Sequence, residues 1–171
     1  MEQVNWLDDL LILFRVKPEL PSAFPPPSTP VPLKETAVTF GPRSLAQLAT
    51  CEQPIRDVFT EVDRRRPCTI IEGARSQADQ DRDFDKGVSK LRWPHGKHNV
   101  VPPATLSRAV DVKPDDLAWT APPEAWKVFA DLVFQVALEI GIKLRWGGAW
   151  NGIYPNPPHD LNDYDHFELA T

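Results

Sequence analysis

Two short segments, 108–112 and 164–169, constrain the fold most, because their side chains alternate between apolar and reactive types. Successive side chains of a β-strand point to opposite faces, so each segment predicts a strand with two different faces. The apolar face is formed by Val110, Val112, Phe167 and Leu169. The other face carries Ala109, Asp111, His166 and Glu168. A sheet must cover its apolar face, so we predict an α+β fold in which helices back a small antiparallel sheet and leave the reactive face open.

Helices that can back this sheet are indicated by apolar residues at helical spacing. Two short helices with a break before Pro54 are predicted from Leu45, Leu48, Ile55, Val58, Phe59 and Val62. The strongest helical pattern begins at Pro122 and Pro123 and ends at Gly141, because proline favours the first helical turn and glycine favours the end. The remaining expected elements are a strand over 69–71, a polar helix from its cap Ser76 to Gly87, a loop over 88–107 and a strand over 142–146.

The first 35 residues differ in composition from the rest of the chain. A short amphipathic helix over 5–14 is predicted from Leu7, Leu10, Leu11 and Phe14. Prolines crowd residues 18–32, and because proline fixes φ and lacks an amide donor, this stretch predicts an extended linker. We therefore predict two parts, a helix with a proline-rich linker over 1–35 and one globular domain over 36–171. The N-terminal helix either docks on the domain or binds a partner, and both interpretations stay open.

Charge and hydropathy narrow the choice of partners. The formal net charge is −5, whereas nucleic acids and anionic membranes favour a concentrated basic surface. No segment approaches the ~18 apolar residues of a membrane span, and the N-terminus lacks the basic start and cleavage site of a signal peptide. Cys51 and Cys68 have no metal-binding spacing, so we expect two buried thiols, with a disulfide as the alternative. We expect a monomer that binds no nucleic acid and does not span a membrane.

The reactive side chains have the composition of a catalytic zinc site. His98, Asp111 and His166 lie on separate segments, and Asp163 precedes the second histidine by three residues. Three such ligands leave the fourth tetrahedral position of zinc open to water, whose pKa the metal lowers to about 7. The spare carboxylate of Asp163 can then accept the proton of that water. Asp111 is the most informative ligand, because a carboxylate within an apolar strand is costly to bury unless it is paired or binds a metal.

Each of these residues also has an ordinary explanation when it is taken alone. His98 lies in a polar loop, where histidines are usually surface groups, and His166 has the sequence context of a histidine packed in the core or at its rim. His95 and His159 compete as metal ligands, and their spacing does not exclude them. The residues by themselves therefore leave the ligand set open.

Several motifs, in the same order, resemble those of the zinc peptidases of the D-alanyl-D-alanine carboxypeptidase family, especially its phage endolysin branch, the L-alanyl-D-glutamate endopeptidases. The similar segments are Gly73-Ala74-Arg75-Ser76 with Gln80, Gly87-Val88-Ser89-Lys90, Gly96-Lys97-His98, Ala109-Val110-Asp111, the run from Ile142 to Asn151, and Asp163-Tyr164-Asp165-His166-Phe167-Glu168. The resemblance covers about residues 40–170. Two departures are Gly96 in place of the family's usual serine and a longer loop between His98 and Asp111.

The resemblance implies a fold like that of hedgehog and D-Ala-D-Ala peptidases, with one Zn²⁺ bound by His98, Asp111 and His166. It also implies that Asp163 is the general base. Asp165 is the weaker candidate for that role, because strand alternation predicts that its side chain points away from the metal.

For the substrate, the resemblance implies that Arg75 binds a peptide carboxylate, since a guanidinium offers two parallel donors. An ion pair with nearby acids is the alternative for Arg75. Gln80 is expected to support this wall of the site rather than to touch substrate. Trp146 and Trp150 are expected to line the groove, with simple packing as the alternative.

The implied function is zinc-dependent hydrolysis of an amide bond in the stem peptide of bacterial peptidoglycan, in the manner of a phage L-alanyl-D-glutamate endopeptidase. Such a lysin is made in the host cytoplasm and acts on the cell wall or periplasm after release. One alternative is a D-Ala-D-Ala carboxypeptidase. A second is a non-catalytic, zinc-stabilised wall-binding or virion module. An acid at position 163 favours an enzyme, because a binding module has no need of a general base.

Overall fold

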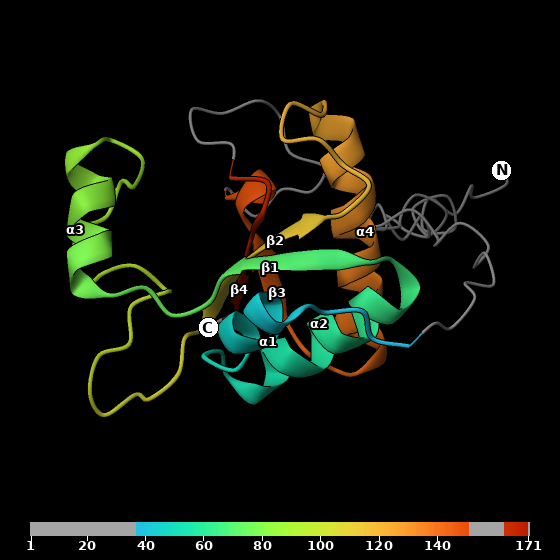
Figure 1. The fold of residues 1–171 in the computed structure, drawn as a ribbon, viewed down its shortest axis with the longest axis horizontal. Coiled ribbons are helices and arrows are strands. Elements are labelled where there is room, and N and C mark those ends of the chain that lie inside the picture. The colour runs from blue at the N-terminus through green and yellow to red at the C-terminus, as the bar shows by residue number, and fades with distance from the viewer. Residues whose placement is uncertain (1–36, 151–162, 171) are drawn as a thin grey trace, which may run out of the picture. The chain divides into compact units, whose positions relative to one another are not determined.

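The computed structural model describes residues 37–150 and 163–170, which contain a four-stranded antiparallel sheet and four α-helices (Figure 1). The strands are β1 (Cys68–Glu72), β2 (Ala109–Pro114), β3 (Leu144–Trp146) and β4 (His166–Leu169). Their order across the sheet is β1-β2-β4-β3. The predicted α+β fold with a small antiparallel sheet is confirmed. The predictions for the helix over 5–14, the proline-rich linker and His159 concern residues outside those described.

Two helices cover one face of this sheet. The helices are α1 (Pro42–Leu48), α2 (Gln53–Arg65), α3 (Gln77–Asp85) and α4 (Pro123–Glu139), with a short 3-10 helix, η1 (Gly147–Ala149), after β3. Phe59 of α2 and Phe129 of α4 both pack edge-on against Phe167 of β4, with ring centroids 5.5 and 6.1 Å away. Because both aromatic rings meet the same side chain, α2 and α4 cover the same face. None of the helices among the described residues is both long and apolar enough to cross a membrane.

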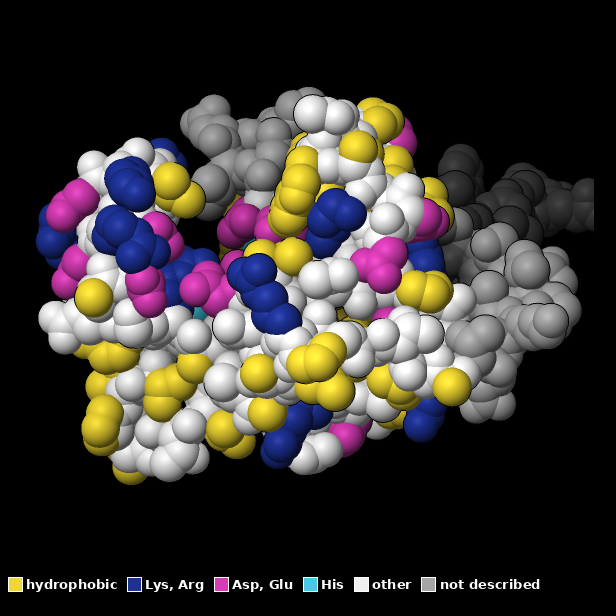
Figure 2. Space-filling view, in the orientation of Figure 1, with side chains coloured by type: hydrophobic (Ala, Val, Ile, Leu, Met, Phe, Trp, Pro, Cys, Tyr) yellow, Lys and Arg dark blue, Asp and Glu magenta, His cyan; other side chains and the backbone are white. Residues whose placement is uncertain are grey.

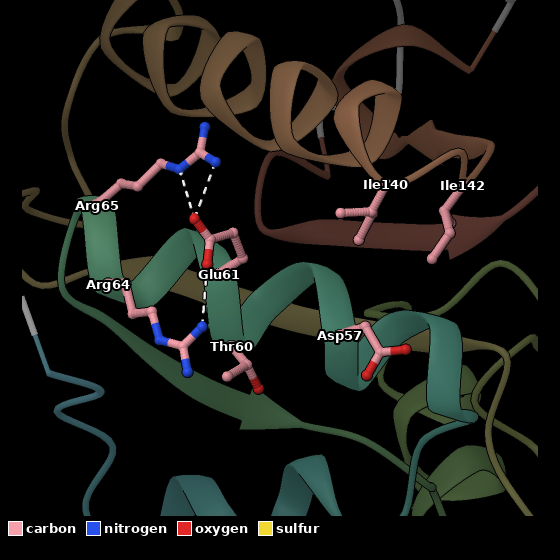
Figure 3. A pocket seen from close by; sticks show the side chains of 7 residues that line it. All are labelled: Asp57, Thr60, Glu61, Arg64, Arg65, Ile140 and Ile142. Carbon is pink, nitrogen blue, oxygen red and sulfur yellow. Dashed lines mark hydrogen bonds and ion pairs between the residues drawn. The ribbon is translucent and has the colours of Figure 1, made fainter. Parts of the chain in front are cut away.

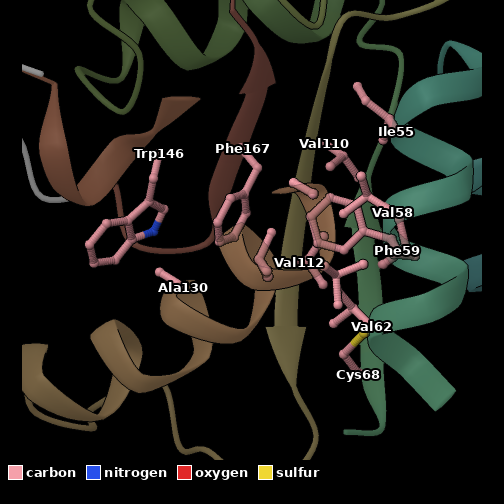
Figure 4. Close-up of a cluster of buried hydrophobic side chains, with 14 of the residues drawn as sticks. Ile55, Val58, Phe59, Val62, Cys68, Val110, Val112, Ala130, Trp146 and Phe167 are labelled. Carbon is pink, nitrogen blue, oxygen red and sulfur yellow. The ribbon is translucent and has the colours of Figure 1, made fainter. Parts of the chain in front are cut away.

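The predicted apolar face forms the core. Val110, Val112 and Phe167 have no exposed surface, and Figure 4 shows Phe167 between the ring of Trp146 and that of Phe59. Burial of each large apolar side chain contributes about 1.5–3 kcal/mol, so this face is the main source of stability. Trp146 is buried here and its indole Nε1 donates to the Tyr164 carbonyl at 2.7 Å. The packing alternative therefore holds for Trp146, which does not line a groove.

The short helix α1 covers the free edge of β1. The Ser44 hydroxyl of α1 accepts a hydrogen bond from the Ile70 amide at 3.2 Å. Directly after the strand, the Gly73 amide donates to Oε1 of Gln47 at 3.0 Å. An edge strand presents unpaired amides, and these contacts satisfy two of them. The chain is therefore already held in place at residue 73, where it approaches the reactive face.

The polar helix α3 has the ends that the sequence predicts. Ser76 caps its first turn by accepting from the Asp79 amide at 3.1 Å, and Gly87, just past its end, has φ of +74°. Figure 2 shows acidic and basic side chains mixed over this helix, at the left of the view. Residues 88–107, which the structure describes in full, contain no helix or strand, as the sequence predicts.

Several details differ from the sequence predictions, among them the start of β3 at Leu144 in place of residue 142. β4 begins at His166 and not at Tyr164, because Tyr164 and Asp165 form a turn. The second helix begins at Gln53, so Pro54 lies in its first turn, where a proline has no amide hydrogen bond to lose. Leu45, expected on a buried helical face, is half exposed. The expectation of buried thiols is confirmed, since Cys51 and Cys68 are both free and buried.

Candidate metal centre

Three side-chain atoms converge on the reactive face of the sheet. Nε2 of His98 lies 3.1 Å from Oδ1 of Asp111 and 3.0 Å from Nδ1 of His166. The third side of this triangle, from Nδ1 of His166 to Oδ1 of Asp111, is 3.1 Å. All three residues are almost completely buried. Among the described residues, this is the group of His, Cys, Asp and Glu side chains that can hold a metal ion.

The register of two strands places two of the three atoms. Asp111 of β2 and His166 of β4 are direct antiparallel partners, so their side chains stand next to each other on the same face. The neighbouring pair, Val110 and Phe167, points to the opposite face and is buried in the core. The alternation that the sequence shows is therefore enough to bring Asp111 and His166 together once β2 and β4 are paired in this register.

His98 reaches the same point from the long loop between α3 and β2. The Arg75 amide donates to the His98 carbonyl at 2.9 Å, and Nδ1 of His98 lies 2.6 Å from the Gly73 carbonyl. The segment that follows β1 thus holds both the backbone and the ring of His98. Gly73 lies in one of the motifs that resemble the family, but the sequence does not predict that its carbonyl contacts His98, because a backbone carbonyl leaves no trace in the residue types.

In each histidine, the hydrogen-bond partner of the ring nitrogen outside the triangle determines whether the nitrogen inside the triangle carries a hydrogen or a lone pair. A carbonyl can only accept, so Nδ1 of His98 carries the hydrogen and Nε2 offers a lone pair. Nε2 of His166 faces Oε2 of Glu168 at 3.4 Å, which likewise places a hydrogen on Nε2 and a lone pair on Nδ1. Metal-binding histidines nearly always donate their other ring nitrogen to a carboxylate or a carbonyl. Both histidines of the site have this arrangement.

Three electron-pair donors at this spacing require a positive charge among them. Burial works against the ionised form of Asp111, but the two imidazoles outweigh it and hold the pKa of Asp111 well below its usual range. Burial also works against the charged form of His166, yet its hydrogen bonds to Asp111 and Glu168 raise its pKa to about 10. A proton on His166 can therefore supply the positive charge, and a metal ion that binds must displace that proton.

The donor set and its size fit a small transition-metal ion. Ligands held at 2.0–2.1 Å around a tetrahedral zinc ion lie roughly 3.3 Å from one another, close to the spacing of these three atoms. Calcium and magnesium prefer six or more oxygen ligands, whereas imidazole nitrogen suits zinc, iron, nickel and copper. With three protein ligands, a tetrahedral ion keeps one position free for water or substrate.

Two further carboxylates lie beside the triangle. Burial raises the pKa of Asp163, and the charges of His166, Asp111, His98 and Arg75 all act on it. Burial and the charges of Asp111 and Asp163 raise the pKa of Asp165 to about 7. The prediction that strand alternation points Asp165 away from the metal rests on a strand beginning at residue 164 and is wrong in that premise, since β4 begins at His166.

Arg75 forms ion pairs within the site. Its guanidinium pairs with Glu72, through Nε at 2.7 Å and through Nη2, and Nη2 also lies 3.4 Å from Oδ2 of Asp111. Arg75 therefore forms the ion pairs with nearby acids that the sequence offered as its alternative role. Because Oδ2 of Asp111 faces Arg75, Oδ1 is left to face the histidines.

Gln80 is hydrogen-bonded to the loop that follows α3. It is buried, its amide nitrogen donates to the Ser89 hydroxyl and the Leu91 carbonyl, and its Oε1 accepts from Nδ2 of Asn99 at 3.1 Å. These contacts tie α3 to both sides of the His98 turn. Gln80 thus belongs to the framework of the site.

Trp150 lies against the site, and His95 does not. The ring centroid of Trp150 is 5.1 Å from that of His166. His95 is exposed and is not part of the triangle, so the structure does not favour it as a ligand. A separate surface depression, shown in Figure 3, is lined by residues of α2 and by Ile140 and Ile142. None of its lining residues belongs to the triangle.

Comparisons with known proteins identify a matching family, a related sequence and a related fold. The sequence model of the phage L-alanyl-D-glutamate peptidase family matches residues 36–170. The L-alanyl-D-glutamate peptidase of Escherichia phage T5 is 29% identical over 117 residues, which cover 66% of this chain and 81% of that protein. The crystal structure of the L-Ala D-Glu endopeptidase ChiX from Serratia marcescens superposes with a TM-score of 0.59 at 25% identity, covering 78% of this chain and 91% of that one.

Proposed function

Because this chain belongs to the phage L-alanyl-D-glutamate peptidase family, we propose that it hydrolyses the L-alanyl-D-glutamate bond of peptidoglycan stem peptides with one bound Zn²⁺. The observation that carries this proposal is the buried triangle formed by Nε2 of His98, Oδ1 of Asp111 and Nδ1 of His166. Two imidazoles and one carboxylate are typical of catalytic zinc sites that keep a position open.

Zinc in this triangle supplies Lewis-acid polarisation of the scissile carbonyl and acidification of the attacking water. The protein groups then move the proton. Asp163 accepts a proton from the water as the water oxygen bonds to the carbonyl carbon. It then delivers that proton to the amine nitrogen as the carbon–nitrogen bond breaks. Burial raises the pKa of Asp163 from its usual value, which suits a group that must hold this proton for part of the cycle.

Arg75 and Trp150 are the proposed substrate contacts. Arg75 offers a guanidinium to a substrate carboxylate, and Glu72 and Asp111 hold that guanidinium beside the metal ligands. The ring of Trp150, next to His166, provides an apolar wall for the peptide. Gln80 keeps the supporting role described above.

The biological setting follows from the family. We propose a lysin that is made in the host cytoplasm and degrades the wall after its release. A D-Ala-D-Ala carboxypeptidase, the alternative activity within the same class of enzymes, is disfavoured because the matching family cleaves the L-alanyl-D-glutamate bond. A non-catalytic zinc module is disfavoured by the acid at position 163 beside the ligands.

The test replaces the two neighbouring acids separately. Asp163→Asn should keep zinc and fold but lower the rate by about 10²–10⁴, because an amide cannot accept the proton of the water. Asp165→Asn is the matched control and should cost less, because the family resemblance assigns the role of general base to Asp163. The measurements are zinc content, turbidity loss of outer-membrane-permeabilised cells, and mass spectrometry of the muropeptides released from purified sacculi.

The outcomes separate the interpretations. Muropeptides with a new amino-terminal D-glutamate identify the cleaved bond, whereas release of D-alanine alone would identify a carboxypeptidase. Wild-type activity of Asp163→Asn would contradict its role as the base. Loss of zinc from that variant would make Asp163 a ligand.

A further inference from the structure

Glu168 is a buried carboxylate on the reactive face whose two oxygens meet different partners. Its side chain is only 4% exposed. Oε1 accepts from Nη1 of Arg145 at 2.8 Å, and Oε2 lies 3.4 Å from Nε2 of His166. An ionised carboxylate is costly to bury unless its oxygens are hydrogen-bonded, and within the described part of the chain Glu168 satisfies this condition by linking an arginine to a histidine of the triangle.

Arg145 is held in a position that keeps this link in place. It is the direct cross-strand partner of Glu168 between β3 and β4. Its guanidinium carbon lies 5.4 Å from the ring centroid of Trp150, and Nη2 donates to the Trp150 carbonyl at 3.4 Å. Arg145 thus contacts Glu168 on one side and Trp150, which lies against His166, on the other.

We propose that Glu168 is a positioning residue for His166, and that Arg145 sets the orientation of Glu168. By accepting the Nε2 hydrogen, Glu168 directs the lone pair of Nδ1 into the triangle and restrains rotation of the ring. This inference rests on the proposed zinc site. It adds that Arg145, Glu168 and His166 act as one chain of hydrogen bonds that determines how tightly the metal is held.

The alternative is an ordinary cross-strand ion pair that only stabilises the sheet. The two interpretations differ for Glu168→Gln. Arg145 can only donate, so it draws the amide oxygen of glutamine to itself and leaves the NH₂ group facing Nε2 of His166. Two donors then face each other, and the imidazole is driven to the tautomer whose hydrogen lies on Nδ1. That tautomer cannot bind the metal through Nδ1.

The experiment measures the Zn²⁺ dissociation constant by competition with a chromophoric chelator. Glu168→Gln should raise the constant by about 10- to 100-fold, the usual effect of losing such a partner. In the double variant with Arg145→Met, the amide is free to turn its oxygen toward His166, so zinc affinity should recover by about tenfold. The matched control is Glu139→Gln, since Glu139 is also paired with an arginine, Arg65, but lies on α4 away from the site.

A second readout does not depend on activity. In the zinc-loaded wild type, ¹⁵N spectra should show the His166 ring with a hydrogen on Nε2, and this signal should weaken in Glu168→Gln and return in the double variant. An unchanged zinc affinity in Glu168→Gln, or a double variant no better than the single one, would overturn the inference. If the wild type itself binds no zinc, the proposed function fails instead, so the two failures are distinguishable.

Discussion

The three proposed metal ligands come from two regions that differ in how they are held. Asp111 and His166 are direct partners in the paired strands β2 and β4, with the hydrophobic core behind them. His98 lies in a long loop without regular structure and depends on the Gly73 carbonyl and the Arg75 amide. A strand ligand is positioned by the same contacts that stabilise the whole sheet, whereas the loop ligand relies on a few specific hydrogen bonds. We therefore expect the geometry of the site to be most sensitive on the loop side.

The largest effect should come from removing one ligand of each kind. His166→Ala and His98→Ala should both lose stoichiometric zinc after dialysis and reduce wall degradation to background, because two ligands do not retain the ion. His95→Ala changes an exposed histidine of the same loop and is the control that should keep both properties. Metal content by atomic absorption checks the result. Full zinc in both ligand variants would show that the ligand set is wrong.

Zinc removal should lower thermal stability by a smaller, measurable amount. An ion that binds only the folded state stabilises it by about 2.7 kcal/mol when the free ion concentration is about 100 times the dissociation constant. For a chain of this size, the melting temperature should fall by roughly 5–10 °C on chelation, as followed by circular dichroism. Amide hydrogen exchange on the same samples compares the loop around His98 with the strands β2 and β4. The loop should lose protection from exchange before the strands do, and the reverse order would show that the loop is not the weaker side of the site.

Gly73→Ala should disturb the loop ligand through the backbone. A methyl group at residue 73 would lie 2.3 Å from the Gln47 carbonyl and 2.2 Å from the Thr50 hydroxyl, so the segment has to shift. We expect a loss of about 1–3 kcal/mol in the free energy of unfolding and about 10- to 100-fold weaker zinc binding, since the carbonyl of residue 73 orients His98.

Gly41→Ala is the control for that variant. None of the described residues comes within 4 Å of a methyl group at residue 41, and the φ of Gly41 is −68°. The change should cost less than about 1 kcal/mol, because Gly41 only caps α1, and it should leave zinc binding unaffected. Equal effects of the two alanine variants on zinc binding would mean that His98 does not depend on Gly73.

Apart from the control variants, Gln80→Ala should have the smallest effect on zinc binding, because it removes support of the loop without changing a proposed ligand or the partner of one. The loss removes the Gln80 acceptor of the Asn99 side-chain amide and one of the two donors to the Leu91 carbonyl, which keeps the Ser89 hydroxyl, at a cost of about 1–3 kcal/mol that is confined to the loop. Amide exchange should accelerate over residues 89–99 and stay unchanged in β2. Uniform acceleration across the sheet would show that the loop and the strands unfold together.

Local sequence patterns predict the order of the elements in the domain and the two faces of the sheet. The alternation in residues 108–112 placed Val110 and Val112 in the core and Asp111 on the reactive face, and Ser76 and Gly141 mark helix ends where the sequence predicts them. These features are local, because periodicity and capping depend on residues a few positions apart. The family motifs then brought His98 and Asp163 into the same site, although neither residue is informative alone.

The tertiary structure alone decided which atoms form the site. It selected Nε2 of His98 but Nδ1 of His166, because the partners of their other nitrogens, the Gly73 carbonyl and Glu168, come from elsewhere in the fold. It also began β4 at His166, which removed the alternation argument against Asp165. Such choices depend on which distant groups meet after the core has packed, and no local pattern of residue types records those meetings.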